Sequence, residues 1–514
     1  MIGAESLLRT LLANGVDVCF MNPGTSEMQF VSALDRVPAM RGVLCLFEGV
    51  CSGAADGYAR MLGRPAATLL HLGPGLANGL ANFHNARKAR SPVVSIVGEH
   101  STRHIPYDAP LTADIGAFAR TVSGWVRTLD AADRMGEAAS AAVAAAVRPP
   151  GQVATLIIPA DHSWSEAGPA GPAVERPARR APAGGAIAES LRLLRSGGRV
   201  GMLLGGSALL EPGLAAAGRI AAASGIPVFA NRYAARLSRG RGRFRARRLA
   251  YFPEQAEGML EGLDHLVLVE AQPPVSFFGY EGRRSCVAPE ACAFHILARE
   301  EEDGTAALEA AAGELGAQPF TAEPRAAPAP PEDGPLDADG IGRVMAALLP
   351  AGAVISEEAV SCGAAICPHL DLAAPHEHLP VTGGAIGQCL PVALGAAIAC
   401  PGRKVVAVEA DGSGLYTMQA LWTMARERLD VVTVILANRR YRILDVEMRR
   451  TGAATVGPRA NDMIDIGRPC LDWVKLSEGM GVPATRAATA AGFAAQFGEA
   501  MSRPGPRLIE AVID

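Results

Sequence analysis

Two oxygen-bearing side chains, Asp411 and Asn438, follow two apolar runs in the last third of the chain. The run Lys404–Glu409 ends just before Asp411, and the run Val431–Leu436 ends just before Asn438. Because ligands of open parallel sheets bind where the strands end, we expect both side chains at one such edge. Carboxylate and amide oxygens suit Mg²⁺ or Ca²⁺ that also binds phosphate oxygens. An ordinary turn that caps a helix is the alternative interpretation of Asp411.

Two side chains that could move protons, Glu48 and His71, follow apolar runs in the first third of the chain. A carboxylate at the end of the run Val43–Phe47 is costly if it is ionised and buried there. A partly exposed glutamate that caps a helix is the alternative. His71 could relay protons, because histidine titrates near neutral pH, whereas a purely structural histidine is the alternative. The sequence thus offers a possible oxygen-ligand pair in one third of the chain and a possible acid–base pair in another.

The elements that would position these residues are short β-branched runs that alternate with Ala- and Leu-rich helical stretches. This alternation predicts parallel sheets covered by helices on both faces. Two segments rich in Pro, Ala and Gly, 166–185 and 316–336, show no helical or alternating periodicity, so we predict that they are linkers. We therefore predict three doubly wound α/β domains with parallel sheets, at residues 1–165, 186–315 and 337–514.

Composition and charge narrow the class of protein. The 514 residues carry 48 basic and 52 acidic side chains, a net charge of −4, which gives no electrostatic reason to expect nucleic-acid binding. We find no apolar run long enough for a transmembrane helix, and we expect no export signal at the N-terminus. Ten cysteines without a disulfide framework suit a reducing compartment. We expect a cytoplasmic enzyme that binds neither nucleic acid nor membrane.

The segment Ala410–Tyr441 resembles the diphosphate- and metal-binding motif of thiamine diphosphate-dependent enzymes, which runs from Gly-Asp-Gly to Asn-Asn. The segment Thr382–Ala399 resembles the Gly-rich stretch that precedes this motif. Ala410 and Ala437 depart from the pattern by replacing the first glycine and the first asparagine, while the ligand positions are kept. The resemblance implies that Mg²⁺ is bound by Asp411, the side chain of Asn438 and the backbone carbonyl of Arg440.

The first block is similar to the pyrimidine-binding domain of the same enzymes. The order of the domains is that of the group containing acetolactate synthase, pyruvate oxidase and benzoylformate decarboxylase. The resemblance implies that Glu48 contacts N1′ of the aminopyrimidine and that Ile386 holds the cofactor bent. His71 and Thr25 match a histidine and an active-site serine of benzoylformate decarboxylases. The implied catalytic residues are Glu48, His71 and Thr25, and the implied cofactor-binding residues are Gly24, Glu48, Gly384, Ile386, Asp411, Gly412, Ser413, Asn438 and Tyr441.

The implied activity is thiamine diphosphate- and Mg²⁺-dependent decarboxylation of a 2-oxo acid. The product would be an aldehyde, or the acyl carbanion would pass to a second carbonyl as in an acetolactate synthase-type carboligase. The segment Pro274–Tyr280 lacks a second histidine expected in benzoylformate decarboxylases, and its Phe277 and Phe278 could line a substrate pocket. A catalytically silent cofactor-binding regulatory subunit and an unrelated phosphate-binding α/β protein are the competing hypotheses. The intact Glu48 argues against the first, and motifs in two separate blocks argue against the second.

The resemblance also bears on partners and further cofactors. The family places its cofactor between two subunits, which implies a homodimer or homotetramer with active sites between subunits. The segment Arg236–Arg248 contains seven arginines, which could bind the pyrophosphate of flavin adenine dinucleotide. We favour the alternative, a solvated basic loop. Cys362 and Cys367 lack metal-ligand spacing, and we interpret them as buried apolar thiols.

Overall fold

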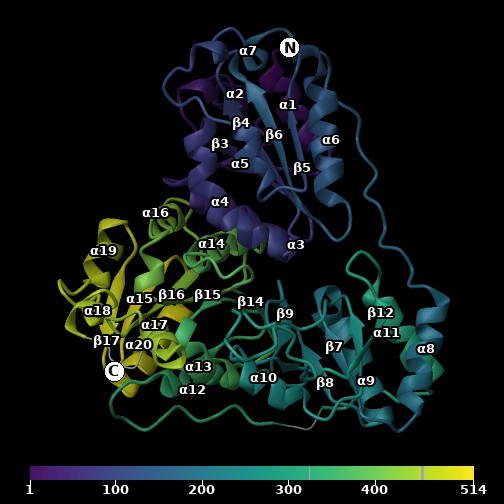
Figure 1. Ribbon diagram of the computed structural model, residues 1–514. Helices are drawn as coiled ribbons and strands as arrows, with labels where there is room; N and C mark the ends of the chain where they lie inside the picture. Colours follow the sequence, from purple (N-terminus) through teal and green to yellow (C-terminus); the bar gives the residue numbers. More distant parts are fainter. Residues whose placement is uncertain (323–324, 453–456, 514) are drawn as a thin grey trace.

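The computed structural model describes residues 1–322, 325–452 and 457–513, and it contains three units of sheet and helix (Figure 1). In Figure 1 the first sheet lies at the top and the other two lie side by side below it. The predicted fold class is confirmed, because each unit is a mainly parallel sheet covered by helices. None of the ten cysteines, all within the described residues, forms a disulfide. In the part of the chain described, no helix is long and apolar enough to cross a bilayer.

The first sheet has six parallel strands. Its elements are α1 Gly3–Ala13, β1 Val18–Asn22, η1 Thr25–Glu27, α2 Met28–Ala33, η2 Leu34–Arg36, β2 Arg41–Leu44, α3 Glu48–Leu62, β3 Ala66–Leu70, α4 Leu72–Lys88, β4 Val93–Glu99, η3 Ile105–Tyr107, α5 Ile115–Arg120, β5 Trp125–Thr128, η4 Ala132–Arg134, α6 Met135–Val147, β6 Val153–Pro159 and α7 Ala160–Trp164. The strand order is β2-β1-β3-β4-β6-β5. Helices α1 and α6 pack on one face and α3, α4 and α5 on the other, so the sheet carries a separate apolar core on each face.

The second sheet has five parallel strands in the order β10-β8-β7-β11-β12. Its elements are α8 Gly184–Arg195, β7 Val200–Leu204, η5 Gly206–Leu209, α9 Glu211–Ser224, β8 Val228–Ala230, β10 Arg247–Arg248, α10 Pro253–Leu260, β11 His265–Val269, β12 Ala293–Ala298 and α11 Gly304–Glu314. Helices α8, α9 and α11 cover one face and α10 covers the other. The sheet therefore has the predicted doubly wound form.

The third sheet has seven strands in the order β17-β18-β16-β15-β13-β14-β9. Its elements are β9 Leu237–Arg239, α12 Ala338–Leu348, β13 Val354–Glu358, η6 Val360–Cys362, α13 Gly363–Leu370, β14 His376–Pro380, α14 Cys389–Ala399, β15 Val405–Ala410, α15 Asp411–Gly414, α16 Gln419–Arg426, β16 Val431–Ala437, α17 Arg442–Arg450, α18 Pro458–Asp462, α19 Trp473–Gly479, β17 Ala484–Ala487, α20 Ala490–Ser502 and β18 Arg507–Val512. Helices α12, α13 and α20 cover one face, and α14, α16 and α19 cover the other.

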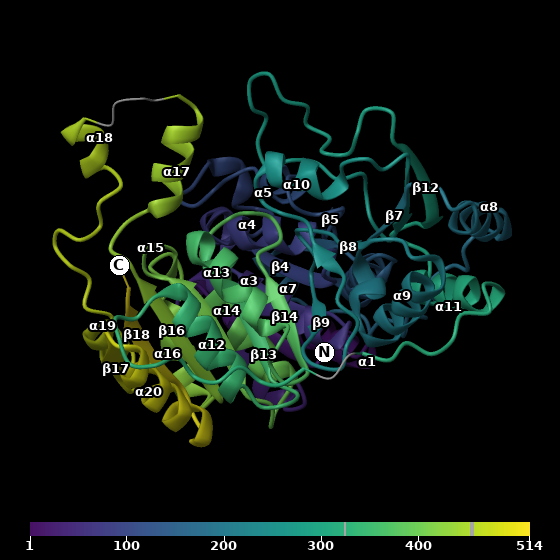
Figure 2. The same cartoon turned by 90° about the horizontal axis from the view of Figure 1, so that it is seen from below.

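One strand of the third sheet comes from the predicted central domain. Strand β9 pairs antiparallel with β14, and the two lie side by side in Figure 2. Arginines beside this pairing form ion pairs with carboxylates of the third unit, at 2.7 Å between Arg239 and Asp371 and 2.7 Å between Arg236 and Glu377. The prediction of a solvated basic loop is therefore wrong, because strand pairing and ion pairs attach this segment to the neighbouring sheet.

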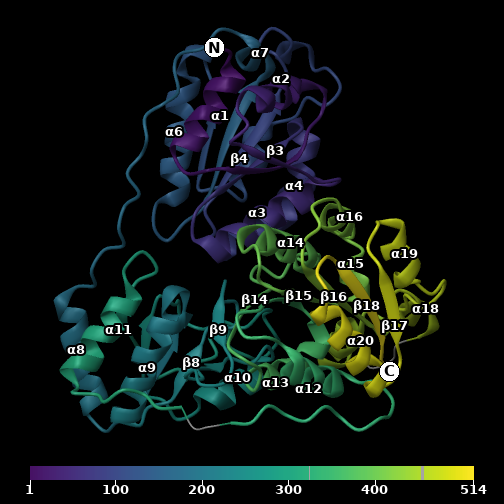
Figure 3. The same cartoon turned by 180° about the vertical axis from the view of Figure 1, so that it is seen from behind.

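Helices α3 and α14 join the first unit to the third by a very close approach of their backbones (Figure 3). A Cβ atom on Gly57 would lie 2.2 Å from the carbonyl oxygen of Val392, and one on Gly395 would lie 1.9 Å from that of Ala54. One apolar core continues across the contact between the two units. Since only glycine leaves this space free, these two glycines set how closely the helices pack.

We expect Gly57→Ala to destabilise the chain by about 2 kcal/mol or more, because the added methyl group must push α3 away from α14. This loss outweighs the gain of about 0.5–1 kcal/mol that alanine brings to a helix interior. Urea and thermal unfolding would measure the effect. Gly258→Ala in α10 is the matched control, since nothing lies within 4 Å of a Cβ added at Gly258. Equal stability of the two variants would contradict the prediction.

Candidate active site

Glu48 is the first residue of α3 and is buried. Its carboxylate accepts hydrogen bonds from the side-chain amides of Asn22 at 3.1 Å and Asn78 at 3.0 Å. Asn22 is the last residue of β1 and Asn78 lies in α4, so three elements of the first unit converge on this carboxylate. Both donors are neutral, and they orient the carboxylate without cancelling its charge.

His71 connects β3 to α4 and lies beside Glu48. A Cβ atom on Gly75 would lie 3.3 Å from Oε1 of Glu48 and 3.4 Å from Cβ of His71, so the two residues flank one glycine. The imidazole also packs against Gly24, where a Cβ atom would lie 2.2 Å from the ring. The structure thus brings Gly24, Glu48 and His71 together, three of the residues selected from the sequence.

Thr25 is exposed, and the side chains within hydrogen-bond distance of His71 are those of the next two residues, Ser26 and Glu27. The ring atom Nδ1 lies 2.8 Å from Oε2 of Glu27 and 3.2 Å from Oγ of Ser26. Neither Ser26 nor Glu27 was selected from the sequence, because an acidic residue in a short helical turn after a glycine is ordinary. The catalytic role of Thr25 stays a prediction.

Asp411 and Asn438 lie close together at the carboxyl edge of the third sheet. Strands β15 and β16 are parallel neighbours, with Ala410 opposite Leu436, so the residues that follow them are adjacent. The backbone N–H of Arg439 donates to Oδ2 of Asp411 at 2.6 Å and ties the two strand ends together.

The chemistry of this pair fits a divalent cation. Asp411 is buried, and burial raises its pKa to about 6 even though the N–H groups of Arg439 and Gly412 act to lower it. Among the ion pairs of the described residues, none involves Asp411. Asn438 Oδ1 accepts only the N–H of Arg440, at 3.0 Å, and its second lone pair has no partner in the described chain. A buried carboxylate without a cation next to an amide oxygen is a donor set that Mg²⁺ accepts.

The remaining candidates around Asp411 differ in where their side chains lie. The ring of Tyr441 covers Gly412, where a Cβ atom would lie 2.5 Å from the ring. The hydroxyl of Ser413 donates to Oε1 of the buried Glu409. The guanidinium of Arg440 pairs with Asp445 of α17, so a metal role for this residue would fall to its backbone carbonyl, as the resemblance implies.

Gly384 and Ile386 lie in the loop between β14 and α14, which helix α4 of the first unit holds in place. The side chain of Asn85 bonds both backbone groups of Ala385, at 2.8 Å and 3.2 Å, and Asn82 donates to the carbonyl of Gly387 at 3.2 Å. Gly384 has φ +81°, a conformation that L side chains rarely adopt. The loop geometry therefore depends on contacts from a different unit of the chain.

This loop borders a cavity of about 1040 Å³ between the second and third units. Besides Gly384 and Ile386, an aromatic wall lines it, formed by Tyr233, Tyr251, Phe277 and Phe278. Phe277 meets the loop directly, because a Cβ atom on Gly384 would lie 2.5 Å from its ring. The rings of Phe277 and Phe278 are 4.6 Å apart between centroids. An apolar aromatic surface thus lies beside the predicted cofactor-binding loop, and α17 adds Ile443 and Leu444 to the lining.

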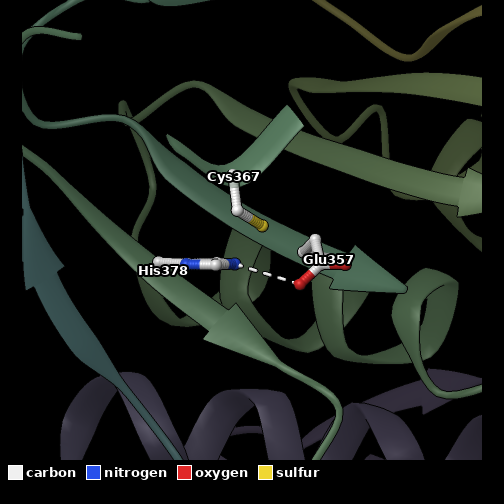
Figure 4. Close-up of side chains that lie close together, drawn as sticks. All are labelled: Glu357, Cys367 and His378. Atoms are coloured by element: carbon white, nitrogen blue, oxygen red, sulfur yellow. Dashed lines mark ion pairs between the residues drawn. The ribbon is translucent and has the colours of Figure 1, made fainter. Parts of the chain in front are cut away.

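A second cluster of possible ligands consists of Glu357, Cys367 and His378, whose ligand atoms lie within 4.8 Å of one another (Figure 4). Arg239 donates to Nδ1 of His378 at 3.0 Å, so the hydrogen of the neutral ring is on Nε2, which faces Glu357 at 3.5 Å. Burial lowers the pKa of His378 to about 4, and the ring is neutral at pH 7. With no lone pair left on His378, we interpret the cluster as part of the network around Arg239 and not as a metal site.

The two groups of candidate residues belong to different sheets. Glu48 and His71 lie on the first unit, and Asp411 and Asn438 on the third. Throughout the described residues, no hydrogen bond or ion pair links a side chain of one group to a side chain of the other. The two units meet through α3 and α14, and through α4 and the loop that contains Gly384.

Comparisons with known proteins match both ends of the chain to one family. The thiamine pyrophosphate enzyme N-terminal TPP binding domain matches residues 1–119. The thiamine pyrophosphate enzyme C-terminal TPP binding domain matches residues 361–511. The two matches contain all the catalytic, cofactor-binding and metal-binding residues that the resemblance implies.

Individual relatives span the whole chain. A putative acetolactate synthase large subunit IlvX of Mycobacterium tuberculosis is 51% identical over 100% of this chain and 99% of its own. A benzoylformate decarboxylase of Pseudomonas aeruginosa is 29% identical over 97% of this chain and 96% of its own. The solved structure of a thiamine diphosphate-dependent 4-hydroxybenzoylformate decarboxylase from Rhodococcus jostii RHA1 matches with a TM-score of 0.87 and 25% identity, covering 100% of both chains.

Proposed function

Because the chain belongs to the thiamine pyrophosphate enzyme family, we propose that it decarboxylates an aryl-substituted 2-oxo acid to an aldehyde, with thiamine diphosphate and Mg²⁺ as cofactors. The observation that carries this proposal is the proximity of Glu48 and His71, which both lie within 3.4 Å of a Cβ atom built on Gly75. Release of an aldehyde needs a proton donor near the carbon that loses carbon dioxide, and His71 beside the buried acid Glu48 supplies one. A silent regulatory subunit would need neither group.

Each candidate residue has a role in this reaction. Thiamine diphosphate, when bound, supplies the carbon nucleophile and accepts the electrons left by carbon dioxide. Asp411, Asn438 and the carbonyl of Arg440 would hold Mg²⁺, which neutralises the diphosphate. Glu48 would share a proton with N1′ of the pyrimidine, and His71 would deliver a proton to the product carbon.

Two observations support an aryl group on the substrate. The cavity beside Gly384 and Ile386 has an aromatic wall that includes Phe277 and Phe278. An aryl ring buries more apolar surface against such a wall than a small methyl group does, and it adds ring–ring contacts. Two full-length relatives are named as decarboxylases of benzoylformate and 4-hydroxybenzoylformate, which are aryl-substituted 2-oxo acids. We leave flavin adenine dinucleotide out of the proposal, because carboxylates already pair with several arginines of the segment that could bind it.

A second candidate function is acetolactate synthase-type carboligation. The observation in its favour is the name of the relative that is 51% identical, a putative acetolactate synthase large subunit. In either case we propose a homodimer or homotetramer, with Glu48 of one subunit and Asp411 of another meeting at one cofactor. The separation of the two groups on different units of one chain agrees with this arrangement.

The test is a panel of 2-oxo acids offered to the protein with thiamine diphosphate and Mg²⁺. We expect benzoylformate and its ring-substituted analogues to release carbon dioxide and an aromatic aldehyde, with kcat/KM on the order of 100-fold above that for pyruvate. Gas release and product chromatography would measure both. Formation of acetolactate from pyruvate would instead favour the second candidate. No turnover of any acid despite bound cofactor would contradict both.

A further inference from the structure

Glu27 is a buried carboxylate that is held from three directions. Oε2 accepts the N–H of Gly24 at 2.8 Å and lies 2.8 Å from Nδ1 of His71, and Oε1 accepts the hydroxyl of Ser26 at 2.8 Å. Only 3% of its side chain is exposed. A Cβ atom on Gly98 of β4 would lie 1.8 Å from Oε1, so the carboxylate occupies space that a glycine leaves free.

These contacts assign the hydrogens of His71. An ionised carboxylate can only accept, so the hydrogen between Oε2 and Nδ1 belongs to the imidazole. Among the described residues His71 is the one basic side chain that pairs with Glu27. No hydrogen bond within the described chain uses Nε2, and 22% of the His71 side chain is exposed. Nε2 is therefore the ring atom that is free to meet a ligand.

The backbone beside His71 also shows that the ring is held in one place. Leu72 has φ +50°, in the left-handed region that a leucine rarely adopts. Such strain persists only where surrounding contacts enforce it, and it gathers at functional sites. The bond to Glu27 and the packing of the ring on Gly24 are the contacts that fix His71 here.

We propose that Glu27 is the positioning residue that keeps His71 in the Nδ1–H form, so that Nε2 exchanges the proton with the substrate. The inference rests on the proposed function only for the identity of that substrate. In the step, the N–H bond at Nε2 of the imidazolium breaks and its electron pair stays on nitrogen. The electron pair on the carbon that lost carbon dioxide forms the new C–H bond, and water returns a proton to Nε2 before the next turnover. A carboxylate on Nδ1 orients the ring and stabilises its positive charge.

The first test reads the tautomer directly in the full-length protein without cofactor. Long-range ¹H–¹⁵N spectra of histidine-labelled protein distinguish Nδ1–H from Nε2–H, and His71→Asn identifies the signals of His71. We expect Nδ1–H in the unmodified protein and a change toward Nε2–H in Glu27→Met, which has no acceptor. Glu27→Gln keeps an acceptor oxygen and should retain much of the Nδ1–H form. Glu99→Gln removes another buried carboxylate of the same unit and should leave the His71 signals unchanged.

The second test is kinetic and uses the holoenzyme. We expect Glu27→Met to lower kcat on the order of 100-fold with little change in KM, and Glu27→Gln to lower it on the order of 10-fold. We also expect the alkaline limb of the pH–rate profile to move to lower pH in Glu27→Gln, because the imidazolium that must donate the proton loses an anionic partner. A purely structural role would lower the melting temperature and leave the tautomer and the profile unchanged.

The outcomes separate this inference from the proposed function. An Nε2–H tautomer in the unmodified protein, or full kcat in a folded Glu27→Met variant, would overturn the role of Glu27 even if the enzyme decarboxylates aryl 2-oxo acids. An Nδ1–H tautomer that depends on Glu27, in a protein that turns over none of these acids, would support the positioning role and reject the proposed reaction. If Glu27→Met does not fold, the tautomer of His71 in the unmodified protein and in Glu27→Gln still tests whether Glu27 positions the ring.

Discussion

Glu48→Gln is expected to lower the rate of decarboxylation on the order of 1000-fold while thiamine diphosphate and Mg²⁺ still bind. The carboxamide fills the same space between Asn22 and Asn78, and one of these two amides must turn so that its oxygen accepts the new N–H₂ group. The carboxamide cannot exchange a proton with the pyrimidine, and the step that depends on this exchange fails. The loss should appear in kcat, because the contact acts on the chemical step and contributes little to binding.

Two measurements together check the role of Glu48. Carbon dioxide release gives the loss of turnover, and calorimetric titration with thiamine diphosphate shows whether the cofactor still binds. Exchange of the C2 hydrogen of the bound cofactor for deuterium isolates the step assigned to Glu48, and it should slow in parallel with turnover. Glu99→Gln, which removes a buried carboxylate at the end of β4, should retain activity. Full activity of Glu48→Gln would remove the acid–base assignment.

Asp411→Asn should have the second large effect, on binding. Replacing the one anionic oxygen donor of the proposed metal site is expected to weaken cofactor affinity at fixed Mg²⁺ by on the order of 100-fold or more. The amide also loses the charge that Mg²⁺ requires, and a donor N–H₂ group would face the N–H of Arg439 or Gly412. Turnover should therefore return only partly when the concentrations of thiamine diphosphate and Mg²⁺ are raised.

The matched control for Asp411 lies at the opposite edge of the same sheet. Asp430 precedes β16 and pairs with Lys404 at 2.5 Å, far along the strand from Asn438. Asp430→Asn should leave the affinity for cofactor unchanged and lower stability slightly. Cofactor titrations of both variants over a range of Mg²⁺ concentrations would compare them. Equal affinity in Asp411→Asn and the unmodified protein would reject the metal site.

Much of the fold follows from local sequence patterns. The apolar runs Lys404–Glu409 and Val431–Leu436 correspond to the buried strands β15 and β16, because each is long enough to span a sheet covered on both faces. After Asp411 the chain does not form one continuous helix. It forms the short helix α15 and the separate helix α16, and between them Thr417 donates to the carbonyl of Gly387. Local periodicity does not reveal a bond to a residue so distant in sequence.

The parts of the site that could not be predicted depend on long-range contacts. Glu27 meets His71 only after β1 and β3 have paired side by side. Strand β9 is three residues long, too short for an alternation of apolar and polar residues to distinguish it from a loop. Its pairing with β14 therefore could not be predicted from the sequence. The meeting of Cys367 with His378 likewise needs a helix to pack on a strand. The residue types at Glu48, Asp411 and Asn438 were enough to indicate chemistry there. The residues that contact them in space could be identified only from the folded structure.

Strand β9 belongs to the central segment of the chain but completes the third sheet. This limits which units can be exchanged between related enzymes. If the segment between the two linkers were replaced by that of another enzyme, the third sheet would lose its edge strand and the carboxylate of Glu377 its arginine partners. A viable chimaera would have to keep residues 236–243 from the parent of the third unit, or take both units from one parent. We therefore expect the second and third units to be inherited together as a single block.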